Sequence, residues 1–414
     1  MRVCFYNPQV ILGRTLFSVI FRTNPDVRFN FILNFFRDKK YSTAIIVDGT
    51  STSMTNGSLL VKFISDNYLI IRMISFVEVY IWCWLNGFDP FKQTIIFNKN
   101  SLDKDKDIIF GFAFFTDTFI NSNIARKGFL NSFGGIKILH ASHFFSRTLL
   151  ISSNIRKTGT RLMVAEADLK KSDYFNKYFD FIEKVYFLPF VVRDRFKKNQ
   201  DFHIRKNKCF ATGALLVLCS DINRCHSDFQ EYVKCFKTRY LQPMRGLIYE
   251  NRENLSDIID SCISPHSREY SKNNFKRILL KIFVKEKKVN KYYSFNIVDK
   301  FNEYKMFIAP EENTGLPSVN FIEGMLCGCA YIGLAHPMYT GFGLKDKVNY
   351  IAYDGTLRGL RDKIEYYQKH ETELSKIAQS GYKLVRENFT EKKVMEYFWN
   401  LMGDIFEKAM PVKK

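Results

Sequence analysis

Short apolar runs alternate with longer amphipathic stretches through the first half of this chain. Runs rich in Val, Ile and Phe occur at residues 3–6, 44–47, 94–97, 108–115, 137–139 and 161–164, and residues 58–85 have helical periodicity. Strands that alternate with helices in this way are typical of βαβ units, in which the strands pair in parallel. We therefore expect a mainly parallel sheet with helical layers in residues 1–200.

The second half repeats this alternation after a segment that predicts an interdomain hinge, residues 185–208, most of it polar and basic. A new strand at residues 209–212 ends in Gly213, as the opening βα unit of a second doubly wound sheet does. We expect an acceptor-binding domain at 1–200, a donor-binding domain at 201–389 and a C-terminal helix at 390–414 that packs back on the first domain. The further elements expected are helices at 297–304, 318–326, 357–369, 371–388 and 390–409 and strands at 306–309 and 330–334.

The chain of 414 residues has 62 Lys and Arg against 42 Asp and Glu, a formal net charge of +20. A surplus of this size suits an anionic partner: nucleic acid, an anionic membrane surface or a phosphorylated substrate. The nine cysteines form no C-x-x-C pair, which favours reduced thiols in a cytoplasmic protein. The longest apolar stretch, residues 59–88, is interrupted by charged residues, so we expect no membrane-spanning helix.

Residues 309–333 hold the densest chemical signal in the chain. They read as a strand, a tight turn rich in Pro and Gly, a helix with Ser318 as its expected N-cap, a glycine stop and a second strand. A turn of this kind points backbone N–H groups at an anion over the carboxyl edge of a sheet, and a diphosphate fits there. Glu323 is then placed for sugar hydroxyls, and Glu312 for the hydroxyls of a transferred group.

This segment resembles the donor site of the GT-B glycosyltransferases, in particular the large retaining group. The matching residues are Glu312-x-x-Gly315-Leu316-Pro317 and then Glu323-Gly324-Met325-Leu326-Cys327-Gly328. The resemblance covers residues 205–400 and implies two Rossmann-like domains that face each other across a cleft. It also implies transfer of a sugar, with retention, from a UDP- or GDP-linked donor, without metal or cofactor.

The spacing of the two glutamates departs from the family pattern. Seven residues separate them in the family, whereas ten separate Glu312 and Glu323. We expect a short insertion in the turn, so that Glu312 keeps its catalytic role while Gly315, Leu316, Pro317 and Ser318 line the donor. The basic pair that neutralises the diphosphate has no clear match, and Arg239 and Arg245 are the residues we assign to it, beside Gly213.

Candidate residues of the first half follow its predicted strands. His140 and His143 come after the strand at residues 137–139, and Asp117 comes just past the strand at 108–115. We therefore expect these side chains near the acceptor at the carboxyl edge of the sheet. The alternation of Asp103, Asp105 and Asp107 precedes its strand and is interleaved with lysines, which is typical of a solvated turn and predicts no metal site.

The resemblance further implies a lipid-linked or polysaccharide acceptor in the synthesis of a bacterial surface glycan, such as lipopolysaccharide O-antigen or capsule. We expect a peripheral location on the inner face of the cytoplasmic membrane, held by charge and released by salt. Two alternatives stay open. One is an inverting GT-B enzyme with His143 or Asp117 as its base, and the other is a basic nucleic-acid-binding protein, although no RNA-binding or zinc pattern supports it.

Overall fold

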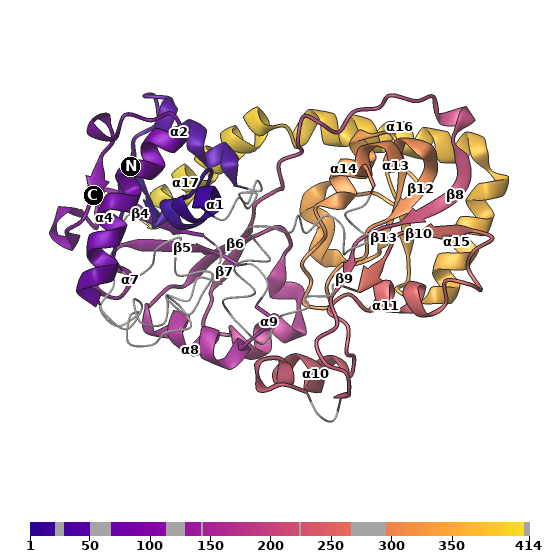
Figure 1. Ribbon diagram of the computed structural model, residues 1–414, viewed down its shortest axis with the longest axis horizontal. Helices are drawn as coiled ribbons and strands as arrows, with labels where there is room; N and C mark the ends of the chain where they lie inside the picture. The colour runs from indigo at the N-terminus through magenta and orange to yellow at the C-terminus, as the bar shows by residue number, and fades with distance from the viewer. Residues whose placement is uncertain are drawn as a thin grey trace.

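A computed structural model describes residues 1–20, 29–49, 68–112, 129–141, 144–222, 225–265 and 295–409. Two α/β units lie side by side along its long axis, one from the first half of the chain and one from the second (Figure 1). Asp117 and His143, and the start of the helix expected at residues 58–85, lie outside the described residues.

The N-terminal sheet has seven parallel strands in the order β3-β2-β1-β4-β5-β6-β7. Its first strand lies inside the sheet, and the order reverses between β1 and β4, as in a doubly wound fold. The strands are β1 (Arg2–Tyr6), β2 (Thr43–Ile46), β3 (Ile95–Ile96), β4 (Asp107–Gly111), β5 (Ile136–His140), β6 (Leu162–Ala165) and β7 (Lys184–Phe187).

The C-terminal sheet has five parallel strands in the order β10-β8-β12-β13-β14. Here the order reverses between β8 and β12, so the carboxyl ends of these two strands form the switch point at which doubly wound sheets bind ligands. The strands are β8 (Lys206–Ala211), β10 (Ile259–Ser261), β12 (Tyr304–Ile308), β13 (Ala330–Leu334) and β14 (Ile351–Tyr353), and β9 (Ala214–Leu215) pairs with β11 (Ser264–Pro265) apart from them.

Helices cover both sheets. Those of the first half are α1 (Leu16–Ile20), α2 (Leu33–Arg37), α4 (Tyr68–Leu85), α7 (Phe129–Ser132), α8 (Thr148–Lys157) and α9 (Asp173–Tyr178). Those of the second half are α10 (Gln230–Phe236), α11 (Pro243–Glu250), α13 (Ile297–Glu303), α14 (Asn320–Leu326), α15 (Leu357–Lys369), α16 (Glu371–Asn388) and α17 (Glu391–Ala409).

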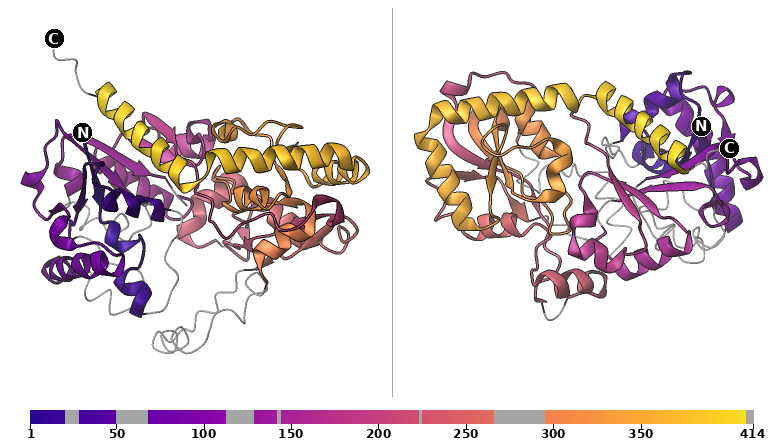
Figure 2. Two further views of the ribbon diagram at one scale, coloured as in Figure 1. Left: turned by 90° about the horizontal axis from the view of Figure 1, so that it is seen from above. Right: turned by 180° about the vertical axis from the view of Figure 1, so that it is seen from behind.

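The last two helices run along one side of the molecule and reach both sheets (Figures 1 and 2). Helix α16 packs on α14 and β13, whereas α17 inserts Phe398 into the core of the N-terminal sheet, with its ring 6.1 Å from Phe5 and 5.0 Å from Phe110. Val394, Met402 and Ile405 are buried on the same face of α17. The expected fold class is therefore confirmed: an α/β protein with two doubly wound parallel sheets and a C-terminal helix that crosses back.

Polar contacts also join the two halves away from α17. Ser172 Oγ donates to the carbonyl of Thr314 over 3.2 Å, and Asp168 N donates to the carbonyl of Met338 over 2.9 Å. Arg147 pairs with Asp228 over 2.9 Å on another part of the interface. The turn after β12 is thus in direct contact with the N-terminal half.

Most predicted element bounds agree with the structure to within one residue, and four differ by more. The strand expected at residues 306–309 begins two residues earlier, at Tyr304. The strand expected at residues 209–212 begins at Lys206, because Lys206 pairs with Tyr304 of β12 although its side chain is exposed. The strand expected at residues 108–115 ends at Gly111. Ser318 is not the N-cap of the helix after the turn: α14 begins at Asn320, and its N-cap, Val319, makes no side-chain cap hydrogen bond.

Candidate functional site

The switch point of the C-terminal sheet brings together the two segments that the sequence singled out. Ala211 at the end of β8 is paired with Ile308 at the end of β12, so Thr212 and Gly213 lie beside the start of the turn that holds Glu311 and Glu312. Parallel strands present their carboxyl ends at one edge. The opening of the second half and the glutamate turn therefore form one site.

Gly213 and Arg245 form the base of this site. Gly213 has a φ of +132°, and a Cβ built on it would lie 2.4 Å from Cζ of Arg245, so only glycine leaves room for the guanidinium. Arg245 comes from α11, is buried, and donates from Nη1 to the carbonyl of Ala214 over 3.0 Å. The structure thus holds a buried cation against the backbone that follows β8.

Glu311 is a site residue that sequence reasoning missed. Its Oε1 accepts hydrogen bonds from the hydroxyl of Tyr331, at 2.8 Å, and from the backbone N–H of Leu334, at 3.1 Å. Burial raises the pKa of this carboxyl, and the charge of Arg245 opposes part of that rise. Two adjacent glutamates stand in the turn, and the sequence alone does not show that Glu311 makes a tertiary contact with β13.

Glu312 is buried beside Glu311 but is held differently. Its Oε2 accepts a hydrogen bond from Thr314 Oγ1 over 3.1 Å, within the turn itself. Burial raises the pKa of the Tyr339 phenol, and the charges of Glu311 and Glu312 add to the rise. The charges of Arg245 and of the two glutamates therefore act on one another or on Tyr339 at the carboxyl edge of this sheet.

The turn is closed more tightly than the sequence predicted. The N–H of Glu312 donates to the carbonyl of Leu316 over 3.0 Å, and the N–H of Gly315 donates to the carbonyl of Glu312 over 2.9 Å. Gly315 has a φ of +100°, and a Cβ there would meet the sulfur of Met338 at 2.6 Å. These two amides are already engaged within the turn, so they are not available to a bound anion.

Glu323 lies on α14, and its side chain is fully buried. Arg193, from the segment between the sheets, donates to Oε1 of Glu323 from Nε over 2.8 Å and also from Nη2. Burial raises the pKa of Glu323 to about 7, although the charge of Arg193 opposes the rise. Its other oxygen, Oε2, has no hydrogen-bond partner among the described residues.

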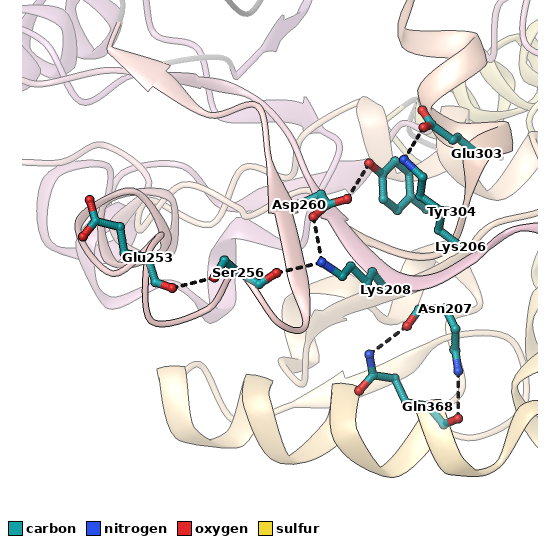
Figure 3. A network of polar contacts seen from close by, with 9 residues as sticks. All are labelled: Lys206, Asn207, Lys208, Glu253, Ser256, Asp260, Glu303, Tyr304 and Gln368. Atoms are coloured by element: carbon teal, nitrogen blue, oxygen red, sulfur yellow. Dashed lines mark hydrogen bonds and ion pairs between the residues drawn. The ribbon is translucent and has the colours of Figure 1, made fainter.

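Two other basic residues of the second half, Arg239 and Lys208, are engaged by neighbouring polar groups. Arg239 is exposed and pairs with Glu250 over 2.7 Å. Lys208, near the amino end of β8, donates to the carbonyl of Ser256 over 2.7 Å and to Asp260 over 3.2 Å, within the polar network of Figure 3. Leu316, Pro317 and Ser318 continue the turn toward α14.

In the N-terminal half, His140 is the described candidate, at the carboxyl end of β5. Its Nε2 lies 3.0 Å from Oε1 of Glu166, which follows β6, and its ring meets Phe29 edge-on at 4.5 Å. His140 is fully buried, and its Nδ1 has no hydrogen-bond partner in the described part of the chain. Glu166, which the sequence did not mark, therefore orients this imidazole.

No group of three or more metal-ligating side chains occurs among the described residues. In the aspartate alternation, Asp103 pairs with Lys106 over 2.8 Å and Asp107 pairs with Arg2 over 2.7 Å. Asp103 is partly exposed, in line with the solvated turn that we expected, whereas Asp107 is fully buried and its partner comes from β1. None of the helices that the structure describes has both the length and the apolar character needed to cross a bilayer.

No family model and no curated protein matches this chain. Among solved structures it is similar to HepE of Anabaena in complex with UDP-glucose, at 9% identity over 98% of this chain and 100% of that one, with a TM-score of 0.49. It is also similar to a sucrose-phosphate synthase of Thermosynechococcus elongatus (8% identity, 99% and 100% covered, TM-score 0.47) and to a glycosyltransferase of Rickettsia africae (14%, 100% and 99%, TM-score 0.44). At such identities no residue-by-residue correspondence follows.

Proposed function

We propose that this chain is a GT-B glycosyltransferase that moves a sugar from a nucleotide-sugar donor to a glycan acceptor. The observation that carries the proposal is the juxtaposition of Arg245, Gly213 and the glutamates 311 and 312 at the switch point of the C-terminal sheet. A buried cation beside two carboxyl groups suits a ligand that has a diphosphate at one end and hydroxyls at the other. A UDP- or GDP-linked sugar has both.

In this proposal each part of the donor has its own residues. The diphosphate lies against Arg245 and the backbone at Gly213, and the turn of Gly315, Leu316, Pro317 and Ser318 backs the sugar. Glu312 accepts hydrogen bonds from hydroxyls of the transferred sugar. Glu323 accepts a hydrogen bond from a hydroxyl of the ribose through Oε2, the oxygen to which Arg193 does not donate.

The transfer breaks the bond between the anomeric carbon and the diphosphate oxygen and forms a bond from that carbon to an acceptor oxygen. The proton of the acceptor hydroxyl passes to the leaving diphosphate, on the same face of the sugar, so that configuration is retained. Arg245 stabilises the charge that develops on the diphosphate, because a fixed cation in a buried site needs no reorganisation during the step. The step uses neither a metal ion nor a cofactor.

The acceptor in this proposal is a lipid-linked or polysaccharide chain of bacterial surface glycan synthesis, bound by the N-terminal half near His140. The net charge of +20 supports a peripheral place on the anionic inner face of the cytoplasmic membrane. Arg239 stays a second candidate for the diphosphate, less favoured because it is exposed and paired with Glu250.

Inverting transfer is the second candidate, and one observation favours it. His140 stands at the carboxyl edge of the N-terminal sheet, and Glu166 holds its Nε2 at 3.0 Å, as an orienting carboxylate holds a general base. His143 and Asp117 stay predictions for the same role. The anomeric configuration of the product, read by proton NMR, separates retention from inversion.

The test of the proposed function is a thermal-shift screen of the full chain with UDP, GDP, CMP and TDP. A ligand that binds only the folded state at a hundredfold excess over its Kd stabilises by about 2.7 kcal/mol. We expect one nucleoside diphosphate to raise the melting temperature of the wild type and of Arg252→Gln, which alters an exposed arginine just after α11. The same ligand should have little effect on Arg245→Gln. If none of the four shifts the folded wild type at millimolar concentration, the proposed function is wrong.

A further inference from the structure

Helix α4 is apolar on both of its long faces. Val79, Trp82 and Cys83 point into the core of the N-terminal half and are fully buried. On the outward side Leu69 is 70% exposed, Met73 72% and Trp84 64%, and Phe76 and Val77 about half. The only acid on the helix, Glu78, is buried with the inward side. A helix that is apolar all round is expected to be covered all round, whereas α4 is covered on one side only by the described residues.

The outward apolar surface continues beyond the helix. The ring of Phe76 lies 5.2 Å from Tyr80 and 4.7 Å from Phe97, and Tyr80 lies 6.0 Å from Phe91 of the 3-10 turn η4 (Pro90–Lys92). Phe91 is 81% exposed. We call this continuous surface the α4 face, formed by Leu69, Met73, Phe76, Val77, Tyr80, Trp84, Phe91 and Phe97.

The charges beside the α4 face are mostly basic. Arg72 on the helix, Lys92 next to Phe91 and Lys99 just after Phe97 are exposed. Apart from the buried Glu78, the acid nearest in sequence is Asp89, which is paired with Lys92 over 3.4 Å. An apolar centre with a tryptophan and cations around it suits the boundary between acyl chains and anionic headgroups. A protein partner would have to present an apolar patch surrounded by acidic residues of its own. An anionic bilayer presents apolar acyl chains and acidic headgroups over its whole surface.

We propose that the α4 face inserts into the interfacial layer of an anionic lipid bilayer. The proposed insertion extends the proposed function, and only its link to a lipid-linked acceptor rests on that function. Helix α4 lies at the end of the molecule away from the C-terminal sheet (Figures 1 and 2), so insertion leaves the donor site clear of lipid. Insertion also changes the expectation, based on charge alone, that salt releases the protein from the membrane. Apolar side chains buried in the bilayer keep the protein bound at salt concentrations that screen the lysines and arginines.

The test compares the full chain with the double variant Met73→Ser/Val77→Ser in vesicle sedimentation. Vesicles of equal parts phosphatidylglycerol and phosphatidylcholine are used at low salt and at about 1 M salt, where the Debye length is about 3 Å. The control is Ile204→Ser, which removes an apolar side chain that is 71% exposed but lies on the segment between the two sheets. Brominated lipid then reports depth, because it quenches the emission of a tryptophan only at close range, and Trp84→Phe identifies the tryptophan concerned.

We expect the wild type and Ile204→Ser to retain part of their binding at high salt, and the double variant to lose about tenfold or more of it. Brominated lipid should quench the wild type and not Trp84→Phe. Equal high-salt binding of the double variant, or quenching unchanged in Trp84→Phe, overturns the inference. So does a wild-type dimer in sedimentation velocity that the double variant breaks, since a second copy would then cover the face. The thermal-shift screen with nucleotides uses no lipid. A negative result in the vesicle assay therefore does not affect the proposed function, and a negative result in the nucleotide screen does not affect the proposed lipid-binding surface.

Discussion

Arg193 and Glu323 form an ion pair that ties the segment between the two sheets to helix α14. The carboxyl is fully buried, the guanidinium is about one third exposed, and one oxygen of Glu323 takes both hydrogen bonds. The residue that the resemblance assigns to the donor ribose is therefore also an anchor between the halves. The two roles make different predictions.

Burial of the Glu323 carboxyl predicts a pH dependence of the folding stability, which the ion pair with Arg193 reduces but does not remove. The carboxyl of Glu323 has a pKa raised from 4.5 to about 7 in the folded protein. Between pH 4.5 and about pH 7 the folded protein keeps a proton on Glu323 that the unfolded chain has lost. The contribution of this group to the free energy of unfolding is therefore complete below pH 4.5 and is lost as the pH rises to about 7. In Glu323→Gln this decline should be absent. Urea unfolding at about pH 5 and about pH 8 measures the difference, with Glu183→Gln, at an exposed glutamate, as the control.

The donor role predicts a separation between two variants of the pair. Glu323→Gln should weaken nucleotide binding by about 1.5 to 3 kcal/mol, the value of one hydrogen bond to a charged group. Arg193→Gln should lower stability but not nucleotide affinity, because Arg193 takes the other oxygen. Isothermal titration with the nucleotide found in the screen measures both. Equal losses of affinity in the two variants would show that Glu323 acts only through the anchor.

Glu312 is predicted to act on turnover more than on binding. Its carboxylate is held by Thr314 Oγ1 at 3.1 Å and is placed for the transferred sugar, whose charge changes during transfer. Glu312→Gln should therefore lower kcat by about tenfold or more while KM for the donor stays close to wild type. Steady-state release of the nucleoside diphosphate measures both constants. Wild-type kcat in Glu312→Gln would remove this residue from the reaction and direct attention to Glu311.

The packing of α17 predicts a large loss of stability when the side chain of Phe398 is shortened to that of alanine. Phe398 is fully buried among Phe5, Phe35 and Phe110. Phe398→Ala should cost about 3 to 5 kcal/mol, the range for a large aromatic side chain removed from a core. Asn400→Ala, on the exposed side of the same helix, should be nearly neutral. A small effect of Phe398→Ala in urea unfolding would show that α17 does not complete the N-terminal core.

The sequence predicted best what depends on local pattern. Helices at residues 357–369 and 371–388 have the expected bounds, because their apolar stripes are continuous and Thr356 caps the first with its side chain. The two parallel sheets followed from the same periodicity. In contrast, the Arg193–Glu323 pair joins residues 130 positions apart, and Glu166 meets His140 only because β5 and β6 are neighbours. Glu311 and Glu312 look alike in the sequence, and the hydrogen bonds of Tyr331 and Leu334 to Glu311 appear only in the fold.

The central claim is that a nucleoside diphosphate binds at the switch point of the C-terminal sheet, against Arg245. Gly213→Ala tests it most directly, because a Cβ there would lie 2.4 Å from Cζ of Arg245 and displace the guanidinium. Isothermal titration of UDP and of GDP into wild type and Gly213→Ala, with circular dichroism to show that both are folded, is the measurement. We predict binding of one nucleotide to the wild type and a loss of about tenfold or more in the variant. Equal affinity in the two folded proteins, or no binding to either, would contradict the claim.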